Sequence, residues 1–363
     1  MRPLIYRYSY MDTIHIDGSF GEGGGQVLRT SLSLAVITGR RLHIDKIRAS
    51  RPKPGLAKQH LTCVEAICEI CAGKCKGVAV GSTELEFEPG DIKAGDYRFD
   101  IGSAGSASLV VQTVLPVLFF ADKQSTVAIT GGTHNAWAPP FDFIKGSFLP
   151  AIAAADFKAE CRLMRYGFFP AGGGGITFEI PPKQNGRGGE INLCESIAEP
   201  RISARIYTSK LPIYIADKQR KLLLSSGLSF ETIEHIEVKD SISAGNCVVI
   251  CIKGENRTTV FTGFGSRGKP SEKVINEVVG EAREFLNSGA AIDHYLADQL
   301  LIYMAMRQGG RFTTNELSKH LTTNIEVIKK FLPADFSVKK QGVVYEIYCR
   351  SNLTGRLFAG ASP

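Results

Sequence analysis

The stretch that decides the fold is residues 23–55, GGGQVLRTSLSLAVITGRRLHIDKIRASRPKPG. Its apolar residues follow a helical spacing from about Gln26 until Gly39, and this pattern predicts a helix. The run from Leu42 to Arg48 predicts a strand, and a loop with two prolines follows it. Beyond this loop we expect a long helix to about Ala72 and two strands, near 78–80 and 84–88.

This order of helix, strand, helix, strand and strand returns twice along the chain. The second copy opens at residues 102–106, GSAGS, and its expected elements are a helix to about Ala121, a strand at 126–130, a helix to about Ala155, and strands at 157–166 and 175–180. The third copy opens at Gly289, with a helix to about Gln308, a strand at 311–314, a helix at 324–331, and strands at 336–339 and 343–348. An internal repeat of this kind predicts one large domain built from similar α/β units.

The spacing of the repeats also predicts an insertion. The interval between the second and third copies exceeds the first interval by about 100 residues, which is the size of a small domain. We therefore expect an α/β (α+β) fold, in which a smaller α/β domain at 185–285 is inserted between units two and three. The large domain would span 11–184 and 286–350, with repeats at about 18–90, 100–182 and 288–349. Residues 1–10 are predicted to be an N-terminal tail, and translation could begin at Met1 or Met11.

Composition sets limits on the class of protein. The 363 residues carry a net charge of +7, which suits an anionic partner. No apolar run reaches the ~18 residues that a membrane helix needs, and the first ten residues lack the apolar core of a secretory signal. We therefore expect a cytoplasmic protein, or a nuclear one if the source is eukaryotic.

Four of the nine cysteines, Cys63, Cys68, Cys71 and Cys75, have a spacing that suggests a metal site. Cys68 and Cys71 also share a helical face with apolar residues, and free cysteine is common in protein cores, so buried thiols are favoured. Cys161, Cys194, Cys247, Cys251 and Cys349 lie in strand-like runs and are expected to be buried as well. The odd number of cysteines argues against a disulfide framework.

A glycine-rich loop, Gly18-Ser19-Phe20-Gly21-Glu22-Gly23-Gly24-Gly25-Gln26, precedes the first helix. Glycines let backbone N–H groups approach phosphate oxygens at a helix N-terminus, although a tight turn would need the same residues. Glu22 places a carboxylate beside this expected anion site, where it is suited to hold a divalent cation.

Basic residues gather where the second helix of the first unit begins. Arg48, Arg51, Lys53, Lys58 and His60 surround this point, and Arg29 lies one turn into the first helix. Such a cluster suits phosphate groups of a nucleotide or of an RNA backbone. A solvated basic face is the alternative, and the location at a helix N-terminus favours phosphate binding.

His320 is the candidate nucleophile. It lies in the polar loop at 317–324, just before Thr322-Thr323-Asn324, which we expect to cap the next helix. The field of a helix N-terminus lowers the pKa of a nearby histidine and favours its neutral, nucleophilic form. From position alone, a surface capping role is at least as well supported as catalysis.

Taken together, these stretches resemble the RNA 3′-terminal phosphate cyclase family. The matching ranges are 21–29, 47–49, 53–56, 59–62, 95–99, 101–106, 112–116, 131–133, 169–174, 295–300 and 320–325. They extend from about residue 14 to the C-terminus, and the segment at about 185–285 matches least. The fold of that family, three α/β units with a small inserted domain, agrees with the repeat. Enolpyruvyl transferases contain related units, so the fold alone does not define the function.

The resemblance implies an ATP-dependent reaction in three steps. His320 attacks the α-phosphorus of ATP, which gives a covalent His–AMP and releases pyrophosphate. AMP passes to an RNA 3′-terminal phosphate, the neighbouring 2′-hydroxyl attacks that phosphate, and AMP leaves a 2′,3′-cyclic phosphate behind. Adenylation supplies the leaving group that a phosphate monoester lacks, and a nucleophilic imidazole divides a hard displacement into easier steps.

The same resemblance implies roles for individual residues. His320 would be catalytic, and Glu22 would help to hold Mg²⁺ or Mn²⁺. ATP would be bound by Gln112, Tyr295, Leu296, Ala297, Asp298 and Gln299. Phosphates of ATP or RNA would be contacted by Arg29, Arg48, Arg51 and His60. The expected partners are ATP and an RNA with a 3′-terminal phosphate, without a membrane, and the protein could be a monomer or a homodimer.

Two other functions stay open at this stage. One branch of the family is a non-catalytic RNA-binding or ribosome-assembly factor that lacks the nucleophilic histidine, and His320 favours the enzyme instead. An enolpyruvyl transferase-like enzyme is disfavoured by the motifs around His320 and Gln112. The chain also departs from the family pattern around Trp137, its single tryptophan, which would either pack against the protein or stack on a base.

Overall fold

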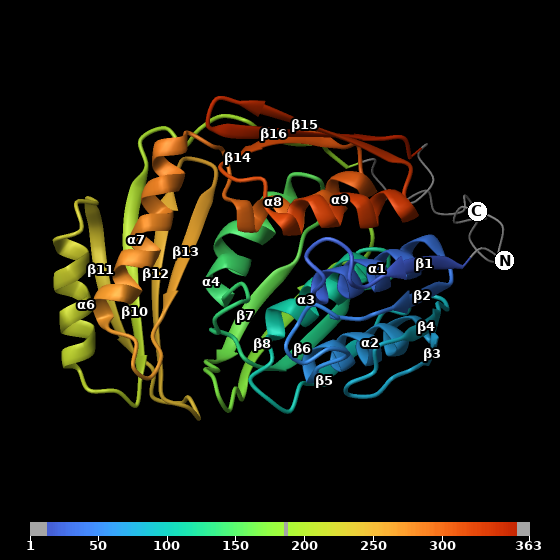
Figure 1. Ribbon diagram of the computed structural model, residues 1–363, viewed down its shortest axis with the longest axis horizontal. Helices are drawn as coiled ribbons and strands as arrows, with labels where there is room; N and C mark the ends of the chain where they lie inside the picture. Colours follow the sequence, from blue (N-terminus) through green and yellow to red (C-terminus); the bar gives the residue numbers. More distant parts are fainter. Residues whose placement is uncertain (1–12, 185–187, 354–363) are drawn as a thin grey trace.

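The computed structural model describes residues 13–184 and 188–353, and the expected N-terminal tail lies outside these residues. Within them the chain forms four four-stranded sheets with helices between them (Figure 1). This confirms the predicted mixed α/β class. Over the same residues, no helix is long and apolar enough to cross a membrane.

The first unit follows the predicted order after one additional strand. Its elements are β1 (Ile14–Asp17), α1 (Gly25–Thr38), β2 (Leu42–Asp45), α2 (Lys58–Cys71), β3 (Lys74–Lys76) and β4 (Leu85–Glu88). The strand expected near 78–80 is wrong, because those residues form a turn between Gly77 and Gly81, both of which have positive φ. The sheet has the order β1-β2-β4-β3, with β1 parallel to β2 and the other neighbours antiparallel.

The second and third units repeat this topology. The second consists of β5 (Asp96–Asp100), α3 (Ala107–Leu118), β6 (Ser125–Gly131), α4 (Phe141–Phe143), the π-helix η1 (Ile144–Phe148), α5 (Leu149–Ala153), β7 (Glu160–Arg165) and β8 (Gly174–Ile180). The third consists of β9 (Ile191–Leu193), α8 (His294–Met306), β14 (Gly310–Thr314), α9 (Lys319–Phe331), β15 (Ala334–Gln341) and β16 (Val344–Ser351). Their sheets have the orders β5-β6-β8-β7 and β9-β14-β16-β15.

Each unit therefore begins with a strand that pairs in parallel with the strand after its first helix. The sequence did not reveal these leading strands, because runs of 3 to 5 residues are too short to show a periodicity. In the third unit the leading strand β9 comes before residues 201–288, and its partner β14 comes after them. These residues form the intervening segment. The domain boundaries at 184 and 286 stay a prediction.

The intervening segment has a sheet and a core of its own. It contains β10 (Arg201–Ser209), α6 (Tyr214–Leu224), β11 (Phe230–Glu237), β12 (Gly245–Lys253), β13 (Thr258–Phe264) and α7 (Ser271–Ser288). The sheet order is β11-β10-β12-β13, and α6 and α7 lie against this sheet, at the left of Figure 1. Val248, Ile250, Phe261, Val278 and Phe285 belong to an apolar cluster separate from the main core.

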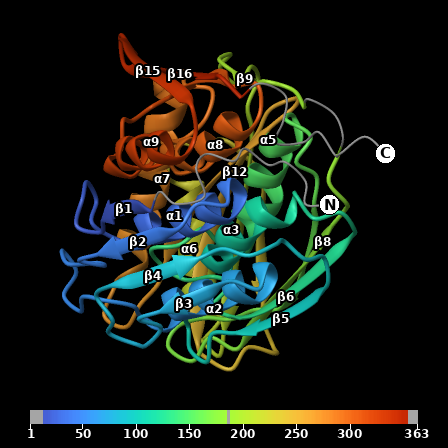
Figure 2. The same cartoon turned by 90° about the vertical axis from the view of Figure 1, so that its right-hand side faces the viewer.

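Helices of the three repeated units meet in the middle of the molecule. Figures 1 and 2 show α1, α3, α8 and α9 between the three outer sheets. Helix α1 packs against α2, α3 and α9, and it is buried on nearly every side because its sequence is apolar or small almost throughout. This arrangement brings the N-terminal ends of α1, α2 and α9 to one place.

The cysteines only partly follow the prediction. Cys63, Cys71, Cys247 and Cys349 are buried free thiols, while Cys161, Cys194 and Cys251 are half-buried. Cys68 and Cys75 are paired as a disulfide, contrary to the expectation of free thiols. The described residues contain no group of three or more histidine, cysteine or acidic side chains that could hold a metal ion, so the metal interpretation of this cysteine run has no support.

Candidate active site

The glycine-rich loop lies directly against the first turn of α9. Gly21 has a φ of +63°, and a Cβ at this position would be 2.0 Å from the Thr323 hydroxyl. The same hydroxyl accepts a hydrogen bond from the backbone N–H of Glu22 at 3.0 Å. A residue with a side chain at position 21 would therefore push the loop away from α9, and Glu22 with it.

His320 lies in the first turn of α9 rather than in the loop before it. The helix begins at Lys319, five residues earlier than predicted, and the Ser318 hydroxyl caps it by accepting from the N–H of Leu321. The prediction that residues 322–324 form the cap is therefore wrong. Serine is a strong N-cap, and the capped turn holds His320 where the helix N-terminus favours negative charge.

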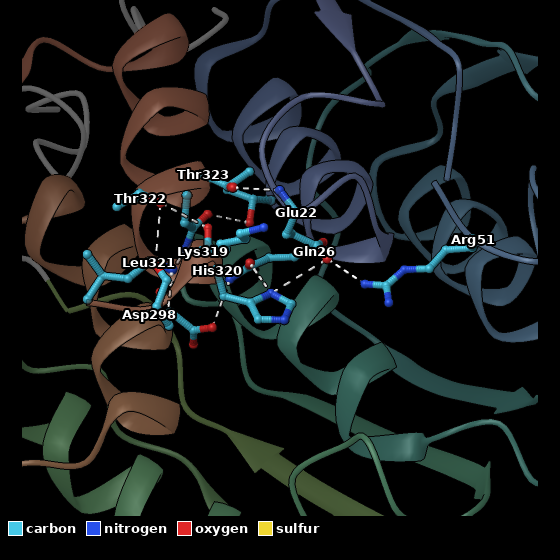
Figure 3. Close-up of polar contacts among 12 residues, drawn as sticks. Glu22, Gln26, Arg51, Asp298, Lys319, His320, Leu321, Thr322 and Thr323 are labelled. Carbon is cyan, nitrogen blue, oxygen red and sulfur yellow. Dashed lines mark hydrogen bonds and ion pairs between the residues drawn. The ribbon is translucent and has the colours of Figure 1, made fainter. Parts of the chain in front are cut away.

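The imidazole of His320 faces the glycine-rich loop and α1 (Figure 3). Its Nδ1 lies 2.9 Å from the Gln26 amide oxygen and 3.9 Å from a carboxylate oxygen of Glu22, and half of the side chain is exposed. Partial burial lowers the pKa of His320; Glu22 raises it, whereas Arg29 and Arg51 lower it. The net lowering favours the neutral imidazole, which is the nucleophilic form.

Glu22 is the one acidic side chain in this loop, and it is almost completely buried, with 4% of the side chain exposed. One carboxylate oxygen pairs with Arg51 at 2.6 Å, and the other has no hydrogen-bond partner among the described residues. A buried, unpartnered carboxylate oxygen fits a cation ligand. Mg²⁺ is commonly held by one or two carboxylates together with phosphate oxygens and water, so a single carboxylate such as Glu22 would be compatible with a bound ion.

His60, in the first turn of α2, provides a neutral donor beside Gly25 at the start of α1. Its Nδ1 accepts from the backbone N–H of Ala57 at 3.3 Å, so a neutral ring carries its proton on Nε2. A Cβ on Gly25 would be only 2.2 Å from this Nε2, so only a glycine lets the start of α1 approach the imidazole this closely. Burial lowers the pKa of His60 to about 3, with smaller contributions from Arg29, Arg48 and Arg51.

The predicted phosphate-binding residues converge around these two histidines. The guanidinium of Arg29 lies beside Gly25 and His60, and Arg51 reaches Glu22. Arg48 instead donates to the carbonyl of Gly55 at 2.7 Å, which commits one of its nitrogens to the loop before α2.

The predicted ATP-binding residues divide into two groups. The amides of Gln112 on α3 and Gln299 on α8 hydrogen-bond to each other, and Gln299 also donates to the carbonyl of Tyr295. Tyr295 is partly exposed at the start of α8. Leu296 and Ala297 are instead buried in the main core, so their side chains serve packing.

Asp298 lies behind the catalytic candidate. Its Oδ2 accepts from the Gln26 amide nitrogen at 3.3 Å, and its backbone carbonyl accepts from Asn324 at 2.7 Å. Burial raises the pKa of Asp298 to about 8; Arg29 and the Gln26 hydrogen bond act in the opposite direction.

Sequence reasoning missed the residues that hold this site together. Ser318 caps α9, Thr323 anchors Glu22, and Asn324 joins Thr30 on α1 to α8. Gln26 follows the glycines and touches both His320 and Asp298. Polar residues in a first helical turn are a general sign of such contacts, but only the fold identifies their partners.

Trp137 is fully exposed, at a φ of +69°, in the loop between β6 and α4. The packing alternative for this residue is therefore wrong, and its ring is free to contact a ligand.

An imidazole at a helix N-terminus, surrounded by arginines and one buried carboxylate, has the composition of an enzyme site that handles phosphate groups. Comparison with known proteins gives a more specific result. The family model described as RNA 3′-terminal phosphate cyclase matches residues 20–338. The chain belongs to this family of enzymes, as the resemblance implied.

Curated relatives agree with the family assignment. A protein named RNA 3′-terminal phosphate cyclase from Ralstonia nicotianae is 44% identical over 90% of this chain and 94% of its own length. Proteins with the same name from Koribacter versatilis and Salmonella enteritidis are 42% and 41% identical, over 97% and 89% of this chain and 98% and 95% of their own lengths.

The environment of His60 predicts how this side chain responds to pH. Its pKa in the unfolded chain is near 6.5 and in the folded protein about 3, so the unfolded chain binds more protons between these values. The stability that His60 contributes is therefore complete above about pH 6.5 and is lost as the pH falls towards 3. In NMR spectra of histidine-labelled protein, we expect the His60 ring signals to stay constant from pH 8 to 5.

His60→Gln identifies these signals by removing them. The same variant should lose less stability on acidification than the unmodified protein, measured by urea unfolding at pH 7 and pH 5. A His60 signal that titrates with a midpoint near 6.5 would show that water and charge reach this side chain, contrary to the geometry described.

Proposed function

We propose that this chain converts an RNA 3′-terminal phosphate into a 2′,3′-cyclic phosphate, with ATP as co-substrate and a covalent His320–AMP as intermediate. The observation that carries the proposal is the half-exposed His320 imidazole in the capped first turn of α9, facing Glu22 and the basic cluster. The names of its relatives support the cyclisation of an RNA 3′-terminal phosphate.

The first step is nucleophilic attack by His320 on the α-phosphorus of ATP. A lone pair of the neutral imidazole forms the N–P bond, the bond to the bridging oxygen breaks, and pyrophosphate leaves. Arg29 and Arg51 lie where they would stabilise charge on the phosphates, and His60 offers a neutral N–H. The N-termini of α1, α2 and α9 add partial positive charge at the same place.

The second and third steps involve the RNA. A 3′-phosphate oxygen attacks the phosphorus of His320–AMP, and the imidazole leaves with its electron pair. The neighbouring 2′-hydroxyl then attacks the activated 3′-phosphate, loses its proton, and expels AMP. The exposed face of the basic cluster would position the RNA phosphate for both displacements.

Other parts of the site would bind the remainder of ATP. The Gln112–Gln299 pair, with Tyr295, provides amide and aromatic groups that suit an adenine base. Glu22 would hold Mg²⁺ or Mn²⁺ through its unpartnered oxygen, with phosphate oxygens and water as further ligands. A bound cation would offset the negative charge of the triphosphate.

The direct experiment uses an RNA oligonucleotide with a 3′-phosphate, ATP and Mg²⁺. The proposal predicts that the RNA end becomes resistant to phosphatase, with one AMP and one pyrophosphate released per end. An oligonucleotide with a 2′-deoxy terminal residue should not cyclise, because it lacks the attacking hydroxyl.

His320→Ala should abolish the conversion, and His15→Ala, the matched substitution on the exposed side of β1, should leave it unchanged. RNA binding by the unmodified protein without ATP consumption would instead favour a non-catalytic RNA-binding or assembly factor.

The role of Glu22 predicts a change in metal dependence. Glu22→Gln keeps the shape of the side chain but removes its charge, so cation binding should weaken. We expect the Mg²⁺ concentration for half-maximal AMP transfer to rise about tenfold or more, equivalent to roughly 1.4 kcal/mol of binding. Glu65→Gln, on the exposed side of α2, is the matched control and should show no change. Unaltered metal dependence in Glu22→Gln would disprove the metal assignment.

A further inference from the structure

Three residues from three different helices form a hydrogen-bonded chain behind the proposed nucleophile. His320 on α9 contacts the Gln26 amide oxygen through Nδ1 at 2.9 Å, and the Gln26 amide nitrogen contacts Oδ2 of Asp298 on α8 at 3.3 Å. Gln26 lies in the first turn of α1 and is 9% exposed. Figure 3 shows Gln26 between the two other side chains.

We infer that Gln26, held by Asp298, is a positioning residue that fixes the tautomer of His320 and presents Nε2 as the attacking atom. This inference rests on the proposed function for its chemical consequence, but the tautomer itself can be measured without ATP.

The chemistry of the Gln26 amide determines where His320 carries its hydrogen. A carbonyl oxygen only accepts hydrogen bonds, so the His320 nitrogen that faces it must carry the hydrogen. A neutral imidazole has one N–H, and with that hydrogen on Nδ1 the lone pair is on Nε2. The Nε2 atom is on the far side of the ring from Gln26 and is free to attack.

The orientation of the amide is fixed from its other end as long as Oδ2 of Asp298 carries no proton. Oδ2 of Asp298 accepts from the Gln26 nitrogen when the acid is ionised, and also when it is protonated on Oδ1. A reversed amide would direct its NH₂ at His320 Nδ1 and would move the imidazole hydrogen to Nε2, which removes the nucleophilic lone pair from that atom.

The helices that carry these three hydrogen-bonded side chains are also held in place. Asn324 on α9 donates to the Asp298 carbonyl at 2.7 Å and accepts from the Thr30 hydroxyl on α1 at 2.8 Å. These two bonds join the helices that carry His320, Gln26 and Asp298. The hydrogen-bonded chain therefore has little freedom to rearrange, as a preorganised site requires.

Glu22 is the competing acceptor. Its carboxylate oxygen is 3.9 Å from His320 Nδ1, beyond hydrogen-bond range, and Arg51 holds it at 2.6 Å. Gln26 thus leaves Glu22 available for a cation, because the imidazole hydrogen already has an acceptor.

The test compares two substitutions of Gln26. Gln26→Met keeps the length of the side chain but removes both hydrogen bonds, and Gln26→Glu keeps an acceptor for Nδ1–H. The ¹⁵N spectrum of histidine-labelled protein at pH 8.5 distinguishes a protonated from an unprotonated ring nitrogen, and His320→Ala identifies the His320 signals.

We expect the unmodified protein and Gln26→Glu to show a protonated Nδ1 and an unprotonated Nε2. Gln26→Met should show a mixture of both tautomers. Loss of a partner that orients a metal-binding histidine typically costs about 10- to 100-fold, and we expect an effect of the same order here. AMP transfer from ATP should therefore slow by about this factor in Gln26→Met, while the KM for ATP changes little. Gln26→Glu should recover part of this rate.

Gln341→Met, the same substitution on the exposed strand β15, is the matched control and should match the unmodified protein in both measurements. An unprotonated Nδ1 in the unmodified protein, or an unchanged tautomer and rate in Gln26→Met, would overturn the inference. If the unmodified protein transfers no AMP, the proposed function fails, and the ¹⁵N spectra alone still decide the role of Gln26.

Discussion

The site depends on the close approach of the glycine-rich loop to the first turn of α9. At Gly21 there is no room for a side chain beside Thr323, and at Gly25 there is none beside His60. The first contact places Glu22 against the N-terminus of α9, and the second lets the start of α1 approach His60 on α2 closely. If either contact were lost, the carboxylate, the nucleophile and the neutral donor would no longer lie close together.

The repeated fold explains how these segments meet. Each unit pairs its leading strand with the strand after its first helix, which directs its helices towards the middle of the molecule. Helices that are apolar on nearly every side, such as α1 and α8, are stable only when neighbouring units cover them. The segment between β9 and α8 forms a separate sheet with its own apolar cluster, while Tyr207, Cys247, Val249 and Val260 of the same segment join the main core.

Sequence reasoning predicted the mixed α/β class and most helices and strands, because hydrophobic periodicity and glycine or proline boundaries are local properties. It missed the short leading strands and began α9 too late, because Ser318 rather than the threonines supplies the cap. It named His320, Glu22, Arg29, Arg51 and His60, which the structure brings together. The Gln26 bridge was beyond its reach, since that residue meets partners 272 and 294 positions away. The side chains of Leu296 and Ala297 lie in the core, and the role of these residues in ATP binding stays a prediction.

The central claim is that one imidazole carries AMP between ATP and RNA. The most direct measurement is the mass of the intact protein after incubation with ATP and Mg²⁺, followed by mapping of the modified peptide under neutral conditions. We expect one AMP per chain, attached to His320, released by mild acid and absent from His320→Ala. An AMP adduct on a different residue, or cyclisation of RNA by a protein that never carries AMP, would contradict it.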